Sequence, residues 1–206
     1  MSPNAKATFA IAADATWPTI KFATDAVGVQ HTWGWKIAWR SYSRSGSTTT
    51  ADCTWDATST VTDLGGEFTV SATAKPAGKT STEQATVAGS IIGTNPNGML
   101  VNAYLVSKFN ASGFGAILKQ ESNYRHFNGQ NESIKSFDNG YGMCQLTTPV
   151  PSYDQVWNWK RNIDGGLALF AQKYTAAIAY LSQSGRSYTA DQLKREAVCR
   201  WNGGAY

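Results

Sequence analysis

The segment "GTNPNG", residues 93–98, divides the chain into two parts with different hydrophobic patterns. Glycine, asparagine and proline favour turns, and the segment has nothing to bury. Before it, short runs rich in Val, Ile, Thr and aromatic residues are separated by turn-forming stretches, as in β-strands. After it, apolar residues recur at helical spacing. We therefore expect two domains, residues 1–95 and residues 96–206.

The first part is expected to be a small all-β sandwich. Its predicted strands are "IKFA" (20–23), "WKIAWRSYS" (35–43), "EFTVSATAK" (67–75) and "QATVAGSII" (84–92). The expected turns between them are "RSGSTTT" (44–50), "DLGG" (63–66) and "KPAGKTST" (75–82). A tryptophan-containing strand followed by "FTVSATA" resembles a bacterial immunoglobulin-like module, which implies a docking or binding role for this domain.

The second part is expected to be all-α. Amphipathic helices are predicted at residues 99–109, 113–122 and 165–183. The apolar face of the longest one is marked by Leu167, Phe170, Tyr174, Ile178 and Leu181. Two capping boxes predict further helix starts, one formed by Ser152 and Gln155, the other by Thr189 and Gln192. The last helix is expected to stop at Gly203-Gly204.

Composition narrows the classes of function. Hydrophobic residues make up 42% of the chain and charged residues 16%, which is typical of a globular protein. Residues 1–95 carry seven Lys/Arg and seven Asp/Glu, whereas residues 96–206 carry eleven and seven, so the net charge of +4 lies in the second part. A basic domain favours an anionic partner, such as nucleic acid, a membrane surface or the bacterial cell wall.

The sequence does not support a metal-binding site or a membrane-spanning segment. The three cysteines form no CxxC pair and the two histidines, His31 and His126, are far apart, so no metal site is expected. No stretch approaches the roughly 20 apolar residues of a membrane span. The N-terminal residues make a poor signal peptide, and synthesis in the cytoplasm is expected.

Glu121 ends an otherwise apolar helical stripe. Phe114, Ile117, Leu118 and Glu121 fall at i, i+3, i+4 and i+7, the spacing of a buried helix face. A half-buried carboxyl group has its charged form disfavoured, so it can hold a proton near neutrality. A general acid at a glycosidic bond needs such a group. The alternative is a glutamate that points outward or pairs with Arg125 at i+4.

Three ordered motifs surround this position. They are "QES" (120–122), "SFDNGYGMCQL" (136–146) and "AVCRWNGG" (197–204), with "NI" (162–163) before the long helix. Together they resemble the soluble lytic transglycosylase family of the goose-type lysozyme-like superfamily, over about residues 99–204. That family has a catalytic Glu-Ser, a Ser with a glycine turn and Gly-x-x-Gln-Leu, an Asn-Ile element and Tyr-Asn-x-Gly.

The resemblance implies a lysozyme-like helical domain that cleaves peptidoglycan without a cofactor. Glu121 would protonate the oxygen between N-acetylmuramic acid and N-acetylglucosamine. The same carboxylate would then deprotonate the muramic C6 hydroxyl, which attacks the anomeric carbon and gives a 1,6-anhydro product. No water is consumed, so the enzyme would be a lyase. The residues that would contact the sugar or orient Glu121 are Ser136, Tyr141, Gln145, Thr147, Trp201 and Asn202.

The chain departs from the family pattern at two of these positions. Trp201 stands where the family has tyrosine, and Thr147 stands where a second methionine often lies. An indole N–H donates a hydrogen bond but cannot accept one, unlike a phenolic hydroxyl. On the same resemblance Cys144 and Cys199 would lie on two motif helices that pack closely. Two buried thiols are favoured there over a disulfide.

Two other functions remain open. A hydrolytic muramidase would use a second carboxylate, for which Glu132, Asp138 and Asp164 are available. Asp138 is preferred because it lies in the glycine turn, although turn formation and helix-dipole compensation also explain Asp138 and Asp164. The second open function is that of a non-catalytic module that binds glycan strands. The loss of the family's tyrosine favours it, and the intact Glu-Ser pair argues against it.

The expected place of action is the cell wall, in the periplasm. Without a signal peptide, the protein would be delivered by cell lysis, as a phage lysin or tail component, or by a secretion system as an antibacterial effector. The β-domain would dock onto the wall, a phage particle or a secretion machine. It could also cover the cleft and inhibit the enzyme. Neither a nucleic acid partner nor a membrane span is expected.

Overall fold

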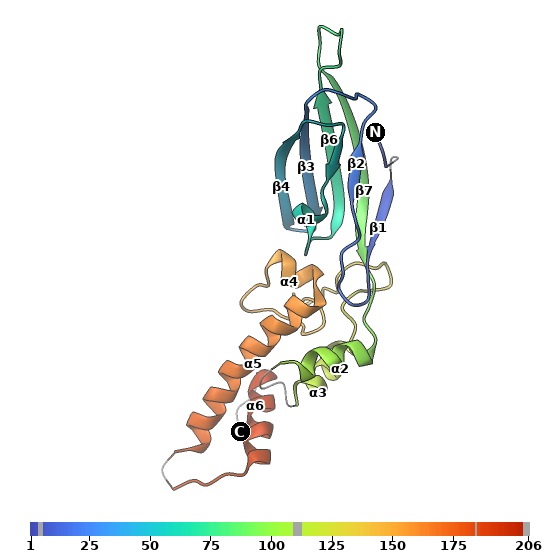
Figure 1. The fold of residues 1–206 in the computed structure, drawn as a ribbon. Coiled ribbons are helices and arrows are strands. Elements are labelled where there is room, and N and C mark those ends of the chain that lie inside the picture. The colour runs from blue at the N-terminus through green and yellow to red at the C-terminus, as the bar shows by residue number, and fades with distance from the viewer. Residues whose placement is uncertain (4–5, 109–112, 184, 204–206) are drawn as a thin grey trace. The chain divides into compact units, whose positions relative to one another are not determined.

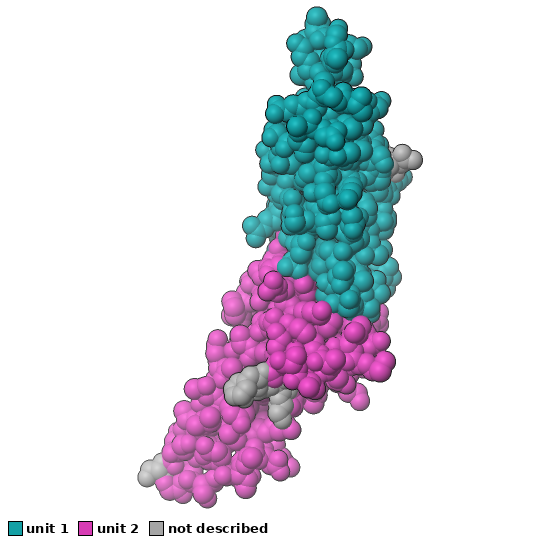
Figure 2. Space-filling view, in the orientation of Figure 1, with its two compact units in different colours: residues 1–95, 127–133 teal, residues 96–126, 134–206 magenta. Residues whose placement is uncertain are grey.

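The computed structural model describes residues 1–3, 6–108, 113–183 and 185–203 (Figure 1). The chain divides into two compact units, shown in separate colours in Figure 2. Unit 1 consists of Met1–Asn95 and Phe127–Ser133, and unit 2 consists of Pro96–His126 and Ile134–Tyr206. The chain therefore passes between the units three times.

Unit 1 is built on a five-stranded sheet with the order β1-β7-β6-β3-β4, and on a separate two-stranded ribbon of β2 and β5. All pairs are antiparallel except β1 with β7, which is parallel. The elements are β1 (Ala7–Ile11), β2 (Lys21–Ala23), β3 (His31–Trp39), β4 (Tyr42–Thr50), β5 (Thr54–Asp56), the short helix α1 (Thr58–Val61), β6 (Gly66–Ala74) and β7 (Glu83–Gly93).

The core of unit 1 lies between one face of the sheet and the ribbon. Side chains of successive strand residues point to opposite faces, and in β3 the buried positions include Trp33 whereas Lys36 is exposed. The ribbon packs on the buried face through aromatic rings. The Phe22 ring lies 5.7 Å from that of Trp55 and 5.9 Å from that of Phe68, between ring centroids.

One predicted strand and one predicted turn are wrong. Residues 35–43 reverse direction at Arg40 and Ser41, and residues 44–50 form most of β4. Trp39 pairs with Tyr42, and Arg40 has a φ of 53°, as the tight two-residue loop of a hairpin requires. Pairing with β3 over nine residues outweighs the turn preference of serine and glycine, because strand preference depends mainly on neighbouring strands.

The segment Phe127–Ser133 belongs to unit 1 although it lies between parts of unit 2 in the sequence. The Phe127 N–H donates to Asn95 Oδ1, and Asn95 Nδ2 donates to the Phe127 carbonyl, each at 2.8 Å. The Gly93 N–H donates to the Asn131 carbonyl at 2.7 Å. A Cβ at position 93 would come within 2.1 Å of the Phe127 ring, so only glycine allows this close contact.

Unit 2 contains five helices among its described residues: α2 (Gly98–Val106), α3 (Phe114–Ser122), α4 (Tyr153–Trp157), α5 (Trp159–Leu181) and α6 (Ala190–Trp201). Both predicted capping boxes are confirmed, at the starts of α4 and α6. The long helix begins at Trp159 because Asn158 Oδ1 accepts the N–H of Lys160 at 2.9 Å. Phe109 and Gly204, where two of the predicted helices were to end, lie outside the described residues.

The predicted fold class, an all-β immunoglobulin-like sandwich followed by an all-α lysozyme-like domain, is wrong. The described residues form a mixed fold, and no all-α C-terminal domain is evident among them. Residues 123–152 contain no helix and include isolated bridges that pair Tyr141 with Lys135 and Leu146. This stretch is rich in Gly, Asn, Ser and Pro, which favour turns. In unit 1 the second layer is only a two-stranded ribbon.

Candidate functional site

Glu121 lies in the last turn of α3 and is half-buried. Phe114, Ile117 and Leu118 of the same helix are fully or almost fully buried, which confirms the apolar part of the predicted stripe. The helix ends at Asn123, whose φ of 51° is left-handed, a common way to end a helix. Glu121 is thus presented at a helix end, with its side chain partly accessible.

The carboxylate of Glu121 has a partner from a distant part of the chain. Trp201 Nε1, in the last turn of α6, donates a hydrogen bond to Glu121 Oε1 at 3.0 Å. Arg125, the partner considered from the sequence, lies beyond the end of α3 and is exposed. The contact with Trp201 brings the first and third sequence motifs together.

Aromatic packing holds the Trp201 indole. Its ring meets Phe114 of α3 edge-to-face, with centroids 5.5 Å apart, and meets Phe170 of α5 at 6.3 Å. Such edge-to-face arrangements are the favoured geometry of aromatic pairs. Since Phe114 is fully buried and Phe170 nearly so, the indole is fixed on one side and its N–H points at the carboxylate.

The second motif forms a compact turn. The Gly140 N–H donates to Ser136 Oγ at 2.8 Å, and Gln145 Nε2 donates to the Gly142 carbonyl at 2.7 Å. A Cβ on Gly140 would come within 2.7 Å of Ser136 Oγ and 2.8 Å of Gln145 Oε1, so these two side chains flank the same glycine. The structure therefore brings Ser136 and Gln145 together, with both side chains hydrogen-bonded inside the turn.

Two buried side chains hold this turn against the helices. Asn162 Oδ1 accepts the N–H of Cys144 at 2.8 Å, and Asn162 Nδ2 donates to the carbonyl of Tyr141 at 3.1 Å. His126 Nδ1 accepts the N–H of Met143 at 3.1 Å, so His126 Nε2 carries the proton that is donated to the Val156 carbonyl at 2.8 Å. Burial lowers the pKa of His126 to about 3. Its role is to support the turn in the neutral form.

Cys144 links the turn electrostatically to Glu121. The thiol is fully buried, and a Cβ on Gly166 of α5 would meet its Sγ at 2.6 Å. Burial raises the pKa of Cys144 well above its ordinary value, and the charges of Glu121 and Asp164 raise it further. The turn, α3 and α5 therefore lie close enough for these charges to act on one thiol. Cys144 and Cys199 are both free thiols.

The proposed second carboxylate, Asp138, is exposed at the tip of the turn, next to a fully exposed Phe137. The hydroxyl of Ser136 donates to Asp138 Oδ1, and this hydrogen bond lowers the pKa of Asp138. The carboxylate is therefore ionised near neutral pH. The Asn139 N–H donates to the Ser136 carbonyl at 3.2 Å, as expected of a turn.

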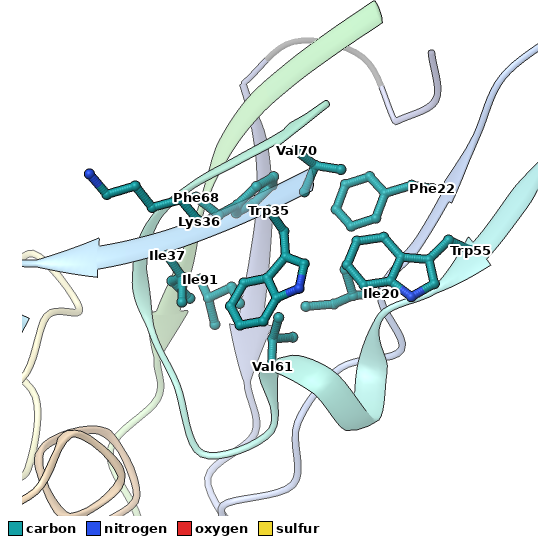
Figure 3. Close-up of a pocket in the computed structure, with 10 residues that line it drawn as sticks. All are labelled: Ile20, Phe22, Trp35, Lys36, Ile37, Trp55, Val61, Phe68, Val70 and Ile91. Carbon is teal, nitrogen blue, oxygen red and sulfur yellow. The ribbon is translucent and has the colours of Figure 1, made fainter. Parts of the chain in front are cut away.

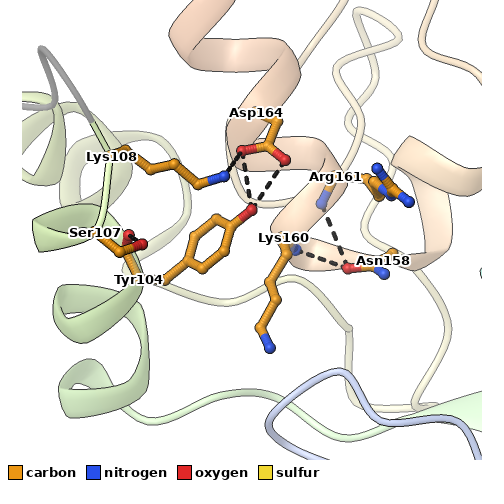
Figure 4. A network of polar contacts seen from close by, with 7 residues as sticks. All are labelled: Tyr104, Ser107, Lys108, Asn158, Lys160, Arg161 and Asp164. Carbon is orange, nitrogen blue, oxygen red and sulfur yellow. Dashed lines mark hydrogen bonds and ion pairs between the residues drawn. The ribbon is translucent and has the colours of Figure 1, made fainter.

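Asp164 belongs to a separate polar network between α2 and α5 (Figure 4). The Tyr104 hydroxyl lies 2.9 Å from each oxygen of Asp164, and Lys108 Nζ lies 2.8 Å from Oδ1. The hydrogen bond to Asp164 raises the pKa of Lys108. Glu132, the other carboxylate considered, lies in the segment that belongs to unit 1.

The remaining predicted site residues have no described contact with Glu121. Thr147 and Asn202 are exposed, and Asn202 caps the C-terminus of α6 through its backbone N–H. Tyr141 is buried, exchanges backbone hydrogen bonds with Leu146 at 3.0 and 3.1 Å, and has Lys135 Nζ 5.7 Å from its ring centroid. A sugar contact by these residues stays a prediction.

Two hollows lie elsewhere in the molecule. An apolar cavity of about 10 Å³ in unit 1, room for about one water molecule, lies between the sheet and the ribbon (Figure 3). An open groove of about 540 Å³ runs along α6, and its lining residues are Asp191, Lys194, Arg195, Val198 and Cys199. Glu121 lines neither hollow.

Within the described part of the chain, no helix combines the length and the apolar character needed to cross a membrane. The same residues contain no group of three or more His, Cys, Asp or Glu side chains that could hold a metal ion. Comparison with protein-family models, with curated proteins and with solved structures found no match.

Proposed function

We propose that this protein cleaves the glycan strands of peptidoglycan, with Glu121 as the acid and then the base. The observation that carries the proposal is the hydrogen bond from Trp201 Nε1 to Glu121 Oε1. It joins two motifs that lie 80 residues apart in the sequence, and both belong to the transglycosylase pattern. The second motif lies near the helix that carries Glu121, since a Cβ on Gly166 would meet Cys144 Sγ at 2.6 Å and the Phe114 ring of α3 at 2.8 Å.

The geometry suggests different tasks for the two carboxyl oxygens. The indole N–H holds Oε1, which leaves Oε2 to carry the proton toward the substrate. In the proposed first step that proton moves to the glycosidic oxygen while the bond to the anomeric carbon breaks. The carboxylate then takes the proton of the muramic C6 hydroxyl, whose oxygen bonds to the anomeric carbon. Glu121 returns to its protonated form, and the 1,6-anhydro product forms without water.

A hydrolytic reaction is the second candidate, supported by the ionised Asp138. The lowered pKa of Asp138 suits a base or a nucleophile, which a two-carboxylate mechanism needs beside the acid. The hydrogen bond from Ser136 and the exposed position at a turn support a structural role equally well. The one-carboxylate reaction is therefore our first proposal.

The test is mass spectrometry of purified peptidoglycan after digestion by wild type, by Glu121→Gln and by Asp138→Asn. The proposal expects 1,6-anhydro muropeptides from wild type and Asp138→Asn, and a loss of about 100-fold or more from Glu121→Gln. Reducing-end products that also need Asp138 would identify a muramidase. Wall binding without any product, retained in Glu121→Gln, would identify a glycan-binding module.

A further inference from the structure

Strand β4 forms one edge of the sheet in unit 1. In the described part of the chain it pairs with β3 and with no other strand. Its register runs without interruption from Trp39 opposite Tyr42 to His31 opposite Thr50. An exposed edge of this length presents unpaired backbone N–H and C=O groups that another strand can bind.

The register shows which residues of β4 direct their backbone N–H and C=O groups away from β3. The two-residue loop makes Trp39 and Tyr42 a hydrogen-bonded pair, and such pairs alternate along an antiparallel ladder. The residues between the hydrogen-bonded pairs direct their N–H and C=O away from β3. On β4 these residues are Ser43, Ser45, Ser47 and Thr49, and all four are exposed.

The usual protection of an edge strand is absent from this one. Edges are normally blocked by proline, by bulges or by several charged side chains. Between Tyr42 and Thr50 there is no proline, the register has no bulge, and Arg44 is the only charged residue. The strand is otherwise composed of serine, threonine, glycine and one tyrosine.

The hairpin around this edge is basic. Residues 31–50 contain Lys36, Arg40 and Arg44 and no Asp or Glu. Arg44 is opposite Ile37 and Lys36 is opposite Ser45, so the two cations lie on opposite faces of the sheet. Asp52 follows after the end of β4, where its carboxylate accepts the N–H of Cys53. A strand added to β4 would lie directly beside Arg44 on one face, with Lys36 one strand further away on the other face.

An aromatic surface lies beside the same edge. Trp35 is only half-buried, and a Cβ on Gly46 would come within 3.0 Å of its ring. Because position 46 is glycine, the Trp35 indole extends over the edge strand. A partner strand could place an apolar side chain against this indole while its backbone pairs with β4.

We propose that the edge of β4 binds an acidic, extended segment of a partner protein by strand addition. Backbone hydrogen bonds give affinity in this mode, and alternate side chains give specificity. Charge selects the occupant. A second copy of this hairpin would bring like charges together, whereas Asp and Glu side chains would face Lys36 and Arg44. This inference is independent of the proposed enzymatic function.

The test is a titration of the isotope-labelled full chain followed by NMR. The probes are two nine-residue peptides with valine at every second position. At the other positions one peptide has threonine and glutamate, and the other has threonine and lysine. The glutamate peptide should shift the amides of Ser43, Ser45, Ser47 and Thr49 with a Kd below about 1 mM, and the lysine peptide should bind at least about 10-fold more weakly. Absence of these shifts, shifts confined to other surfaces or equal binding of both peptides would overturn the proposal.

Backbone pairing is tested with Ser45→Pro. It removes one outward N–H without touching the ladder to β3, because Pro is tolerated where the N–H faces solvent. Binding should weaken about 10-fold or more, whereas Ser45→Ala should bind as wild type does. If Ser45→Pro fails to fold, N-methylation of the peptide amides that would face β4 tests the same bonds. Unchanged binding in either form contradicts strand addition.

A second copy as the occupant is tested without any peptide. In sedimentation experiments, the wild-type chain should not form a dimer through the β4 edge. The contrary result would be a dimer that increases with protein concentration and is lost in Ser45→Pro. Such a dimer would assign the edge to self-association and overturn the proposal.

Discussion

At the scale of single residues, the decisive contact is the one between Trp201 and Glu121. The indole donates through Nε1 and cannot accept, so it orients a carboxyl oxygen whether the group is charged or protonated. The same ring packs against Phe114 and Phe170. If Glu121 is catalytic, as we propose, Trp201 would be both a structural and a positioning residue. The two contributions can be separated by substitution.

Trp201→Phe should keep the aromatic packing and lose the hydrogen bond. We expect kcat to fall about 10- to 150-fold, since a hydrogen bond to a charged group contributes about 1.5–3 kcal/mol. The melting temperature should change little compared with Trp201→Ala, which loses the packing as well. The measurement is the release of anhydro products, with thermal unfolding alongside. Full activity in Trp201→Phe would show that the indole does not position Glu121.

At the scale of elements, the turn of residues 136–146 depends on two side chains that lie outside it. Asn162 of α5 binds its backbone at Tyr141 and Cys144, and His126 binds it at Met143. Gly142, with a φ of 68°, allows this approach because a Cβ there would meet His126 at 2.5 Å and Asn162 at 2.7 Å. The second motif is therefore shaped by its supports as well as by its own residues.

Burial of neutral His126 predicts a pH dependence of stability. The pKa of His126 is lowered from 6.5 to about 3 in the folded chain, so between these values the unfolded chain binds the extra proton. The free energy of unfolding should therefore fall as the pH falls through this window, by up to about 1.4 kcal/mol per pH unit. Urea unfolding between pH 7 and 4 measures the slope.

His126→Gln is the comparison for this slope, because glutamine cannot titrate. Its pH dependence should be shallower than that of wild type by the His126 contribution. The ring itself can be followed by NMR in the folded wild-type chain, where it should stay neutral at pH 5. Protonation of the ring near pH 6.5 would refute the assignment.

At the scale of the whole molecule, the connection between the units involves more than the link at residues 93–98. The segment Phe127–Ser133 returns to unit 1, where the fully buried Phe127 lies on Gly93 and exchanges hydrogen bonds with Asn95. The roles predicted for the two parts, docking and catalysis, stay predictions, as does the route of delivery to the wall.

Two glycines of the link test this connection. Gly93→Ala should lower the free energy of unfolding by about 1–3 kcal/mol, because a Cβ would overlap the Phe127 ring at 2.1 Å. Gly98→Ala, at the start of α2, meets nothing within 4 Å and should be neutral or slightly stabilising. Urea unfolding followed by tryptophan fluorescence compares them. Equal effects of the two changes would contradict the packing of Phe127 on the link.

The sequence by itself determined the features that depend on local interactions. Helix starts at the capping boxes of Ser152 and Thr189 were predictable, because a cap joins residues three positions apart. The buried residues of α3 followed from their helical spacing for the same reason. The predicted face of α5 was only partly right, since Phe170 is buried whereas Tyr174 and Ile178 are exposed.

Only the tertiary structure decided which distant segments meet. The hairpin at Arg40 and Ser41, the return of Phe127–Ser133 to unit 1 and the contact of Trp201 with Glu121 all depend on long-range pairing or packing. The same local pattern is compatible with many such arrangements, because strand preference and burial are set by neighbours that are remote in sequence. For this reason the helix caps and the buried residues of α3 could be predicted from the sequence, whereas the fold class could not.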